Sequence, residues 1–423
     1  MASHGVSRSV RPRTEEQRLQ EAEKIKKYRG LEAQLRTELA HHSQGPDVFA
    51  LTSRLLKLNP EYYSVWNDRR RLLISGLLSA PSAGCSRSRA SPSSSRTSTT
   101  TTSSAASSAS SSNTTPPTRA SQTTGPSGTT ADDGDAAAGT VTGDHPGNGD
   151  GDGGDKAKDQ DMLRSELAFT IPLLMEFPKC YWIWNYRLWV LQQAVQRLDV
   201  PVARRIWEEE LGLVGKMLTR DRRNFHAWGY RRHVVAKLES ADLAGKSLVP
   251  AEFEYTTKMI RVDLSNFSAW HNRSKLIPRL LKEQGAGDAE RKKLLDDELK
   301  LIRDALNVGP EDQSLWYYHQ FLMLNVFDTL GSESMAPNLS TAERVAYVSR
   351  EMDDIKDLLE DYDDTKWLYE ALVEYTVALS RVESRKLTDE ELGHLREWLG
   401  KLEELDPMRK GRWTDARKEH GLG

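Results

Sequence analysis

The stretch DRRNFHAWGYRRHVV, residues 221–235, decides the fold because four other stretches of the chain share its layout. The five are NPEYYSVWNDRRRLL (59–73), FPKCYWIWNYRLWVL (177–191), DRRNFHAWGYRRHVV itself, DLSNFSAWHNRSKLI (263–277) and GPEDQSLWYYHQFLM (309–323). Each carries one tryptophan at the same place, namely Trp66, Trp184, Trp228, Trp270 and Trp316. Internal self-similarity of this kind is the mark of a repeat protein.

The tryptophans are 118, 44, 42 and 46 residues apart, so the first step is far longer than the others. It contains a low-complexity segment, residues 79–160, composed mainly of Ser, Thr, Ala, Gly, Pro and Asp. Such a composition cannot bury enough apolar surface to offset the entropy lost on ordering. We therefore predict a disordered insertion between the first and second repeats. Without it, the first step shortens to about 38 residues.

Each repeat has the pattern of a helical hairpin. A segment with helical apolar periodicity, such as ELKLIRDALNV (298–308), precedes a turn containing Pro, Asn or Asp, and a second helix then carries the tryptophan. No alternating strand pattern of useful length occurs. The pattern predicts an all-α fold, an α-α superhelix (solenoid) of stacked helical hairpins. The period argues against 34-residue tetratricopeptide repeats but leaves HEAT-like repeats open, and a weaker sixth unit is expected around Trp367.

These patterns predict the following organisation along the chain. The expected segments are a flexible N-terminus (1–14), an N-terminal helix with the first repeat (15–78), the disordered insertion (79–160), the remaining hairpin repeats (161–415) and a flexible C-terminus (416–423).

In four repeats an arginine follows the tryptophan by three residues, which places both side chains on one helix face. The pairs are Trp66/Arg69, Trp184/Arg187, Trp228/Arg231 and Trp270/Arg273, whereas Trp316 is followed by His319. We predict a structural role: the indole fills the space between hairpins, and the guanidinium lies on that ring and donates to exposed carbonyls at helix ends.

Composition narrows the class of protein. The net charge of -3 argues against a general nucleic-acid binder. The chain has two cysteines, and Cys85 falls in the predicted insertion, so a reducing compartment is expected. No apolar run is long enough for a membrane span or a signal peptide. A cytoplasmic protein with no membrane span is therefore expected.

The tryptophan, the arginine and the period in the forties resemble the repeats of protein prenyltransferase α-subunits. Within that family, FPKCYWIWNYRLWVL (177–191) and LDPMRKGRW (405–413) are most similar to the Rab geranylgeranyltransferase (type II) α-subunit of fungal type. The resemblance covers all of the chain except the insertion and the extreme N-terminus.

The resemblance implies an α-subunit that wraps a β-subunit in an obligate heterodimer. That enzyme transfers geranylgeranyl from geranylgeranyl diphosphate to C-terminal cysteines of Rab GTPases, which a Rab escort protein presents. Two alternatives stay open: the α-subunit of farnesyltransferase or type I geranylgeranyltransferase, and a non-catalytic helical-repeat adaptor.

Alignment of the repeats singles out three residues that can carry a positive charge. Two positions before the tryptophan, four repeats have Ser or Trp and the third has His226. Five positions before it, the second repeat has Lys179 and the third has Arg223, which is expected to be solvated. In the resembling family, the lysine of a Pro-Lys-x-Tyr element and the histidine of an aromatic-His-x-Trp element reach the diphosphate site of the β-subunit. These correspond to Lys179 and His226, whereas Phe225 replaces a frequent tyrosine and keeps a packing role at this diphosphate rim.

Both Lys179 and His226 could instead have no role in the chemistry. A single histidine is usually a partly buried side chain with its hydrogen bonds formed, and a lysine in a turn is usually a solvated surface charge. The sequence offers no convincing zinc site, so no cofactor is expected on this chain. The resemblance implies that the zinc lies in the β-subunit.

Overall fold

The computed structural model describes residues 14–81, 151–327 and 330–422. No residue in these ranges is in a β-strand, so the all-α prediction is confirmed. The helices are α1 (Glu15–Ala40), α2 (Pro46–Leu58), α3 (Tyr63–Leu72), α4 (Gly151–Glu176), α5 (Tyr181–Arg197), α6 (Val200–Arg220), α7 (Phe225–Leu238), α8 (Val249–Val262), α9 (Phe267–Glu283), α10 (Asp288–Leu306), α11 (Gln313–Val326), α12 (Thr341–Asp361), α13 (Lys366–Val382), α14 (Asp389–Leu405) and α15 (Lys410–Glu419). Short helical turns are η1 (Leu73–Leu77), η3 (Ala241–Leu243), η4 (Gly331–Glu333) and η5 (Pro407–Arg409).

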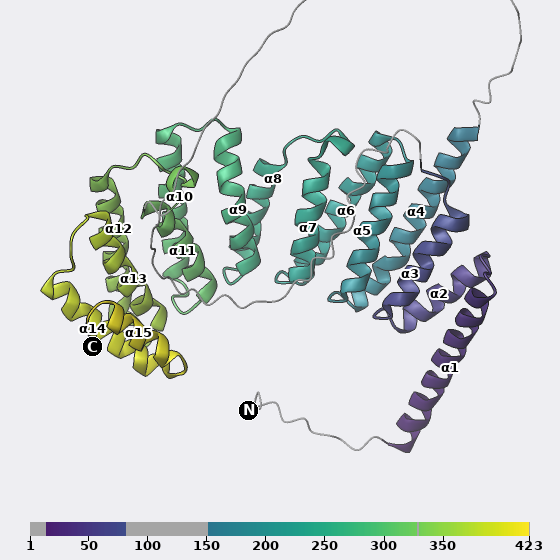
Figure 1. Cartoon of the computed structure of the whole chain (residues 1–423), viewed down its shortest axis with the longest axis horizontal. Coiled ribbons are helices and arrows are strands. Elements are labelled where there is room, and N and C mark those ends of the chain that lie inside the picture. The colour runs from purple at the N-terminus through teal and green to yellow at the C-terminus, as the bar shows by residue number, and fades with distance from the viewer. Residues whose placement is uncertain (1–13, 82–150, 328–329, 423) are drawn as a thin grey trace, which may run out of the picture. The chain divides into compact units, whose positions relative to one another are not determined.

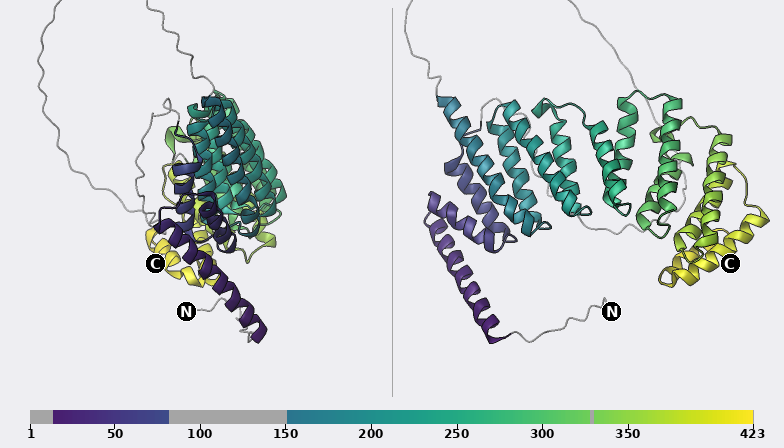
Figure 2. Two further views of the ribbon diagram at one scale, coloured as in Figure 1. Left: turned by 90° about the vertical axis from the view of Figure 1, so that its right-hand side faces the viewer. Right: turned by 180° about the vertical axis from the view of Figure 1, so that it is seen from behind.

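The described residues of 14–81 and 155–422 form one compact unit, in which successive helices pair as antiparallel hairpins (Figure 1). The hairpins are α2–α3, α4–α5, α6–α7, α8–α9, α10–α11 and α12–α13, and each contains one repeat. Second helices of neighbouring hairpins pack together, as α3 does with α5 and α9 with α11. The hairpins stand in chain order when seen from either side (Figure 2). The predicted solenoid of stacked hairpins is therefore confirmed.

Short turns and caps fix where the helices begin and end. Between α4 and α5 the turn is only residues 177–180, and Pro178 lies within it. Asn224 caps α7 and Asn266 caps α9, because each side-chain oxygen accepts a hydrogen bond from an otherwise unpaired backbone N–H. Among the described helices, none is long and apolar enough to cross a membrane.

The predicted insertion, residues 79–160, lies mostly outside the described residues, as does Cys85. Its last part differs from the prediction, because residues 151–160 belong to α4. Asp159 is buried, and its carboxylate accepts hydrogen bonds from the backbone N–H of Ser79 (2.9 Å) and from the Ser79 hydroxyl. Charge and glycine content suggested disorder there, whereas the contact with Ser79 and the apolar helix that follows hold this segment in place.

The predicted flexible ends can be placed only in part. Residues 1–13 and 423 lie outside the described residues, and Thr14 caps α1. The predicted flexible segment 416–423 begins inside α15, which continues to Glu419, and Leu422 is buried. The apolar side chain of Leu422 thus packs the end of the chain into the hydrophobic core.

The sixth hairpin uses a tyrosine where the other repeats use tryptophan. The hydroxyl of Tyr369 donates to the carbonyl oxygen of Asp363, six residues earlier, at 2.8 Å. Each of the five tryptophans makes the same bond over the same separation. A sixth unit therefore exists, but Tyr369 and not Trp367 occupies the tryptophan position, because a phenol can also donate to that carbonyl.

Candidate functional site

Each repeat tryptophan fixes the turn that precedes its own helix. The indole Nε1 donates to a backbone carbonyl six residues earlier at 2.6 to 2.9 Å, and these carbonyls belong to Pro60, Pro178, Arg222, Leu264 and Pro310. All five tryptophans, Trp66, Trp184, Trp228, Trp270 and Trp316, are buried. The tryptophan therefore sets the geometry of a turn as well as filling the core.

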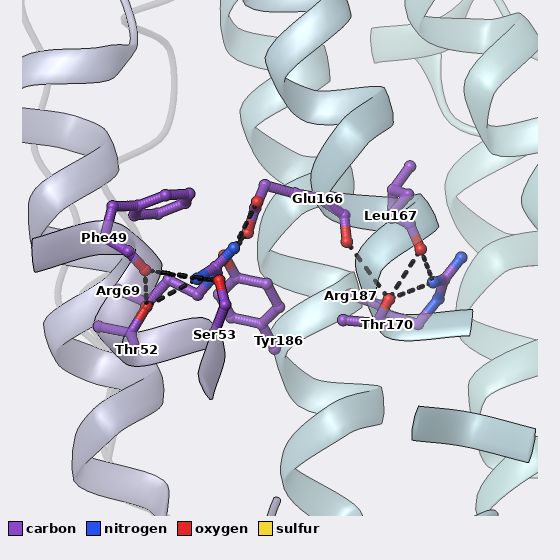
Figure 3. Close-up of polar contacts among 9 residues, drawn as sticks. All are labelled: Phe49, Thr52, Ser53, Arg69, Glu166, Leu167, Thr170, Tyr186 and Arg187. Carbon is purple, nitrogen blue, oxygen red and sulfur yellow. Dashed lines mark hydrogen bonds and ion pairs between the residues drawn. The ribbon is translucent and has the colours of Figure 1, made fainter. Parts of the chain in front are cut away.

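The arginines of the repeats bind carboxylates of the next hairpin. Both Nε and Nη2 of each guanidinium contact one glutamate, at 2.5 to 2.9 Å, and all eight side chains are buried. We call these four pairs the Arg–Glu ladder: Arg69–Glu166, Arg187–Glu210, Arg231–Glu252 and Arg273–Glu298. Figure 3 shows the first pair, with Nη1 of Arg69 turned toward Thr52 and Ser53.

Of two sequence-based expectations for these arginines, one is wrong for Arg69 and the other holds in part. The Arg69 guanidinium lies over the ring of Phe49, 3.8 Å from its centroid, and not over an indole. Its Nη1 does donate to a backbone carbonyl, that of Phe49 at 3.3 Å, but its main partner is the carboxylate of Glu166. A buried guanidinium needs a compensating negative charge, which carbonyl dipoles do not supply.

The glutamates of the ladder were missed by sequence reasoning, although a signal for them exists. Glu166, Glu210, Glu252 and Glu298 each lie 18 residues before the tryptophan of their own hairpin, and Glu351 lies 18 residues before Tyr369. In three hairpins a buried tyrosine also donates to the same carboxylate at 2.5 Å, as Tyr230 does to Glu210. Burial, and then the charge of Glu210, raises the pKa of Tyr230 well above its usual value, so the hydroxyl remains a donor.

The contact between the fifth and sixth hairpins, which we call the fifth joint, has no Arg–Glu pair of the ladder type among the described residues. His319 takes the arginine position, with Nε2 3.2 Å from Oε2 of Glu351 and Nδ1 2.6 Å from the hydroxyl of Tyr375. Arg303, on the first helix of the hairpin, donates to Oε1 of Glu351 at 2.6 Å. This arginine therefore lies on the first helix of its hairpin, α10, whereas each ladder arginine lies on the second helix of its hairpin.

Lys179 lies in the turn between α4 and α5, directly after Pro178. Its side chain is 74% exposed, and Nζ is 3.9 Å from Oδ2 of Asp221 in the next turn. An ion pair at that separation and exposure contributes little. The ammonium group is therefore free to turn toward an anion.

His226 is the second residue of α7, in the hairpin next to Lys179. Burial lowers the pKa of His226 below its usual value, the Glu61 carboxylate raises it and the Lys179 ammonium lowers it. The carbonyl of Pro178, directly before Lys179, accepts a hydrogen bond from Asn224 at 3.0 Å, so the Lys179 turn lies against the start of α7. At neutral pH the imidazole is uncharged and offers one N–H donor.

Aromatic side chains surround the pair. Phe225 is 68% exposed, and its ring centroid is 4.0 Å from that of His226. The centroid of the Tyr181 ring lies 6.5 Å from that of His226, and Tyr181 is also exposed. Sequence reasoning did not include Tyr181 in the site. Its signal in the sequence is the aromatic residue three positions before the tryptophan, which the first four repeats share.

Arg223 occupies in the third repeat the place that Lys179 has in the second. It is held firmly, because Nε and Nη2 contact the two oxygens of Asp263 at 3.0 and 2.8 Å. The two cations at this level of the stack therefore differ: Arg223 is neutralised within the protein, and Lys179 is barely paired.

Taken together, the turns of the second and third repeats offer one mobile ammonium group and one neutral imidazole to an anion. Within the described ranges, no cluster of three or more His, Cys, Asp or Glu side chains could hold a metal ion. The site can bind and stabilise negative charge.

Comparisons with known proteins agree with the repeat structure. The family described as "Protein prenyltransferase alpha subunit repeat" matches residues 46–75, 163–194, 207–238, 249–280 and 295–326. These segments fall on the first five hairpins.

Full-length relatives are similar throughout. The chain is 30% identical over 426 aligned positions to the geranylgeranyl transferase type-2 subunit alpha of Schizosaccharomyces pombe, covering 98% of each chain. It is 27% identical over 441 positions to the protein of the same name from Candida albicans, covering 97% of this chain and 96% of that one. The Saccharomyces cerevisiae protein of that name is 29% identical over 258 positions, or 60% of this chain and 73% of the relative.

Proposed function

Because the chain belongs to the protein prenyltransferase alpha-subunit family, we propose that it is the α-subunit of a type-2 geranylgeranyl transferase. In this proposal it forms a heterodimer with a β-subunit. The heterodimer transfers geranylgeranyl from geranylgeranyl diphosphate to C-terminal cysteines of Rab GTPases. A Rab escort protein presents the Rab, and the reaction takes place in the cytoplasm.

The assignment to type 2 is supported by the fungal relatives that match along nearly their whole length, both of which are type-2 α-subunits by name. The α-subunit of farnesyltransferase or type I geranylgeranyltransferase, and a non-catalytic adaptor, remain the competing functions. An adaptor would need the stacked hairpins but would have no use for a barely paired Lys179 beside a neutral His226.

That pair is the observation that carries the catalytic part of the proposal. When a thiolate displaces diphosphate from an allylic carbon, negative charge accumulates on the leaving group, and cations or hydrogen-bond donors aimed at it lower the barrier. The ammonium of Lys179 and an N–H of His226 are suited to that role. The rings of Phe225 and Tyr181 lie near the imidazole of His226, with centroids 4.0 and 6.5 Å from it.

We assign only diphosphate contacts to this chain and place the zinc ion expected in this family in the β-subunit. Zinc favours thiolate and imidazole ligands in tetrahedral geometry. Cys180, the cysteine among the described residues, is buried, and burial raises the pKa of its thiol to about 11. Such a thiol is a poor zinc ligand, because ligation requires the thiolate.

The proposal is tested by purifying the chain with the β-subunit from its own cell and comparing acceptors. A Rab ending in two cysteines with its escort protein, and a CaaX peptide, are each incubated with geranylgeranyl or farnesyl diphosphate. We expect transfer of geranylgeranyl to the Rab alone. Transfer to the CaaX peptide would indicate the farnesyltransferase or type I alternative, and no transfer to either would indicate an adaptor.

A further inference from the structure

Asn224 connects the two halves of the proposed site. It is buried, and its Oδ1 accepts hydrogen bonds from the backbone N–H groups of His226 (3.1 Å) and Ala227 (3.3 Å). Its Nδ2 donates to the carbonyl oxygen of Pro178 at 3.0 Å. Pro178 directly precedes Lys179, so one amide contacts the backbone of both functional segments.

The Pro178 carbonyl is held from two sides. Trp184, on the helix that follows the turn, donates to this oxygen from Nε1 at 2.9 Å, and Asn224 donates to it from the next hairpin. Both acceptor positions of the oxygen are thus used. The tryptophan fixes the turn relative to its own helix, whereas Asn224 fixes it relative to α7 and His226.

The same position in other repeats makes related contacts. Asn266 donates from Nδ2 to the carbonyl of Arg222 at 3.0 Å, and its Oδ1 accepts from Ala269 N–H at 3.2 Å. The Cys180 thiol contacts the carbonyl oxygen of Pro60 at 3.5 Å, whereas the carboxylate side chain of Asp312 has no N–H to donate. Asn224 and Asn266 are therefore matched clamps, but only Asn224 joins the turn of Lys179 to the helix of His226.

We propose that Asn224 is a positioning residue: it fixes the turn that carries Lys179 relative to His226, so that both side chains reach the same diphosphate. The inference rests on the proposed function. Among the described residues, the exposed Lys179 side chain has only the carboxylate of Asp221, 3.9 Å away, as an ion-pair partner, so the backbone of its turn determines where the ammonium can reach. A displacement of about 1 Å can cost about 100-fold in rate when groups must meet a transition state together.

The test compares Asn224→Ser with Asn266→Ser in the reconstituted heterodimer. Serine keeps the helix cap but is too short to maintain the amide contact with the neighbouring turn. We expect both variants to lose a similar amount of thermal stability. Asn224→Ser should lower kcat by about 10- to 100-fold and weaken inhibition by inorganic diphosphate, while Asn266→Ser stays within about twofold of the wild type.

A double variant distinguishes an effect through the position of Lys179 from a general loss of stability. If Asn224 acts through Lys179, adding Asn224→Ser to Lys179→Ala should lower kcat by much less than Asn224→Ser does alone. If the serine variants do not assemble with the β-subunit, Asn224→Thr and Asn266→Thr give the same comparison, because threonine also caps helices.

Two results would overturn the inference, and they are distinguishable. Equal kcat values for Asn224→Ser and Asn266→Ser, with Lys179→Ala impaired, would make Asn224 a structural clamp only and leave the proposed function intact. An unimpaired Lys179→Ala would remove the catalytic role of this chain, and with it anything for Asn224 to position.

Discussion

Arg69 of α3 and Glu166 of α4 form two hydrogen bonds, at 2.6 and 2.7 Å, although 97 residues separate them along the chain. The pair is buried and joins the first hairpin to the second. Ser79 and Asp159 add a second connection between the same segments. The long intervening stretch therefore begins and ends at points that the folded chain already holds together.

This arrangement predicts that residues 83–150 can be replaced without loss of assembly. Ser79 contacts Asp159, and the part of α4 that precedes Asp159, residues 151–158, is about 12 Å long. A linker must span about that distance, and an eight-residue glycine–serine linker reaches about 16 Å on average. We expect the shortened chain to keep its melting temperature within about 2 °C and its transferase activity within about twofold, since loop length alters closure entropy only slowly. Differential scanning fluorimetry and the transfer assay measure these two quantities.

A matched control uses the same linker together with Glu166→Gln, which should lower the melting temperature markedly. If the linker alone has that effect, the replaced residues contribute to the fold.

Removing one partner of a buried ion pair in the ladder should lower the free energy of unfolding strongly. Replacing all partners together by apolar residues should lower it much less. Arg187→Met leaves the buried carboxylate of Glu210 with only Tyr230 as a partner, and we expect the free energy of unfolding to fall by about 3–5 kcal/mol. The triple variant Arg187→Met, Glu210→Met, Tyr230→Phe removes both charges and the hydroxyl, and should lose much less. Urea denaturation followed by circular dichroism compares the two. Equal losses would show that packing, and not an unpaired charge, causes the effect.

The joint at Glu351 should give a pH-dependent stability. Burial opposes the charge of Glu351, yet contacts with His319 and Arg303 hold its pKa below the usual value. The unfolded chain therefore takes up this proton first, and the stability that Glu351 contributes is present above about pH 4.3 and is lost as the pH falls further.

Melting temperatures of the wild type and Glu351→Gln, measured from pH 6 to pH 3, should therefore converge as the pH falls. A constant difference over that range would mean that ionisation of Glu351 does not stabilise the joint.

The period of the tryptophans was enough to predict helical hairpins, because the indole must pack at the same place in each repeat. The Arg–Glu ladder was not predicted, since alignment around the tryptophan did not extend 18 residues back to the glutamates. Helix α4 begins earlier than its composition suggested. The contact with Ser79 that holds this part of the helix could not be predicted, because Ser79 lies 80 residues before Asp159. Nothing in the sequence pairs Asn224 with Pro178, 46 residues earlier, and only the structure reveals their contact.

For the candidate site, Lys179 and His226 came from resemblance, and their roles stay predictions. What the structure adds is the contrast between Lys179 and Arg223, since only Arg223 is firmly paired. Two cations at equivalent positions thus provide an internal comparison that alignment of the repeats alone did not supply.

The central claim is that this chain supplies a cation to the leaving diphosphate. Its most direct test is single-turnover transfer by heterodimers carrying Lys179→Ala or Arg223→Ala, with assembly checked by gel filtration. We predict that Lys179→Ala assembles normally and lowers the rate by about 10²- to 10³-fold, as loss of one group that stabilises transition-state charge does, whereas Arg223→Ala stays near the wild-type rate. Equal rates for Lys179→Ala and the wild type would contradict the claim.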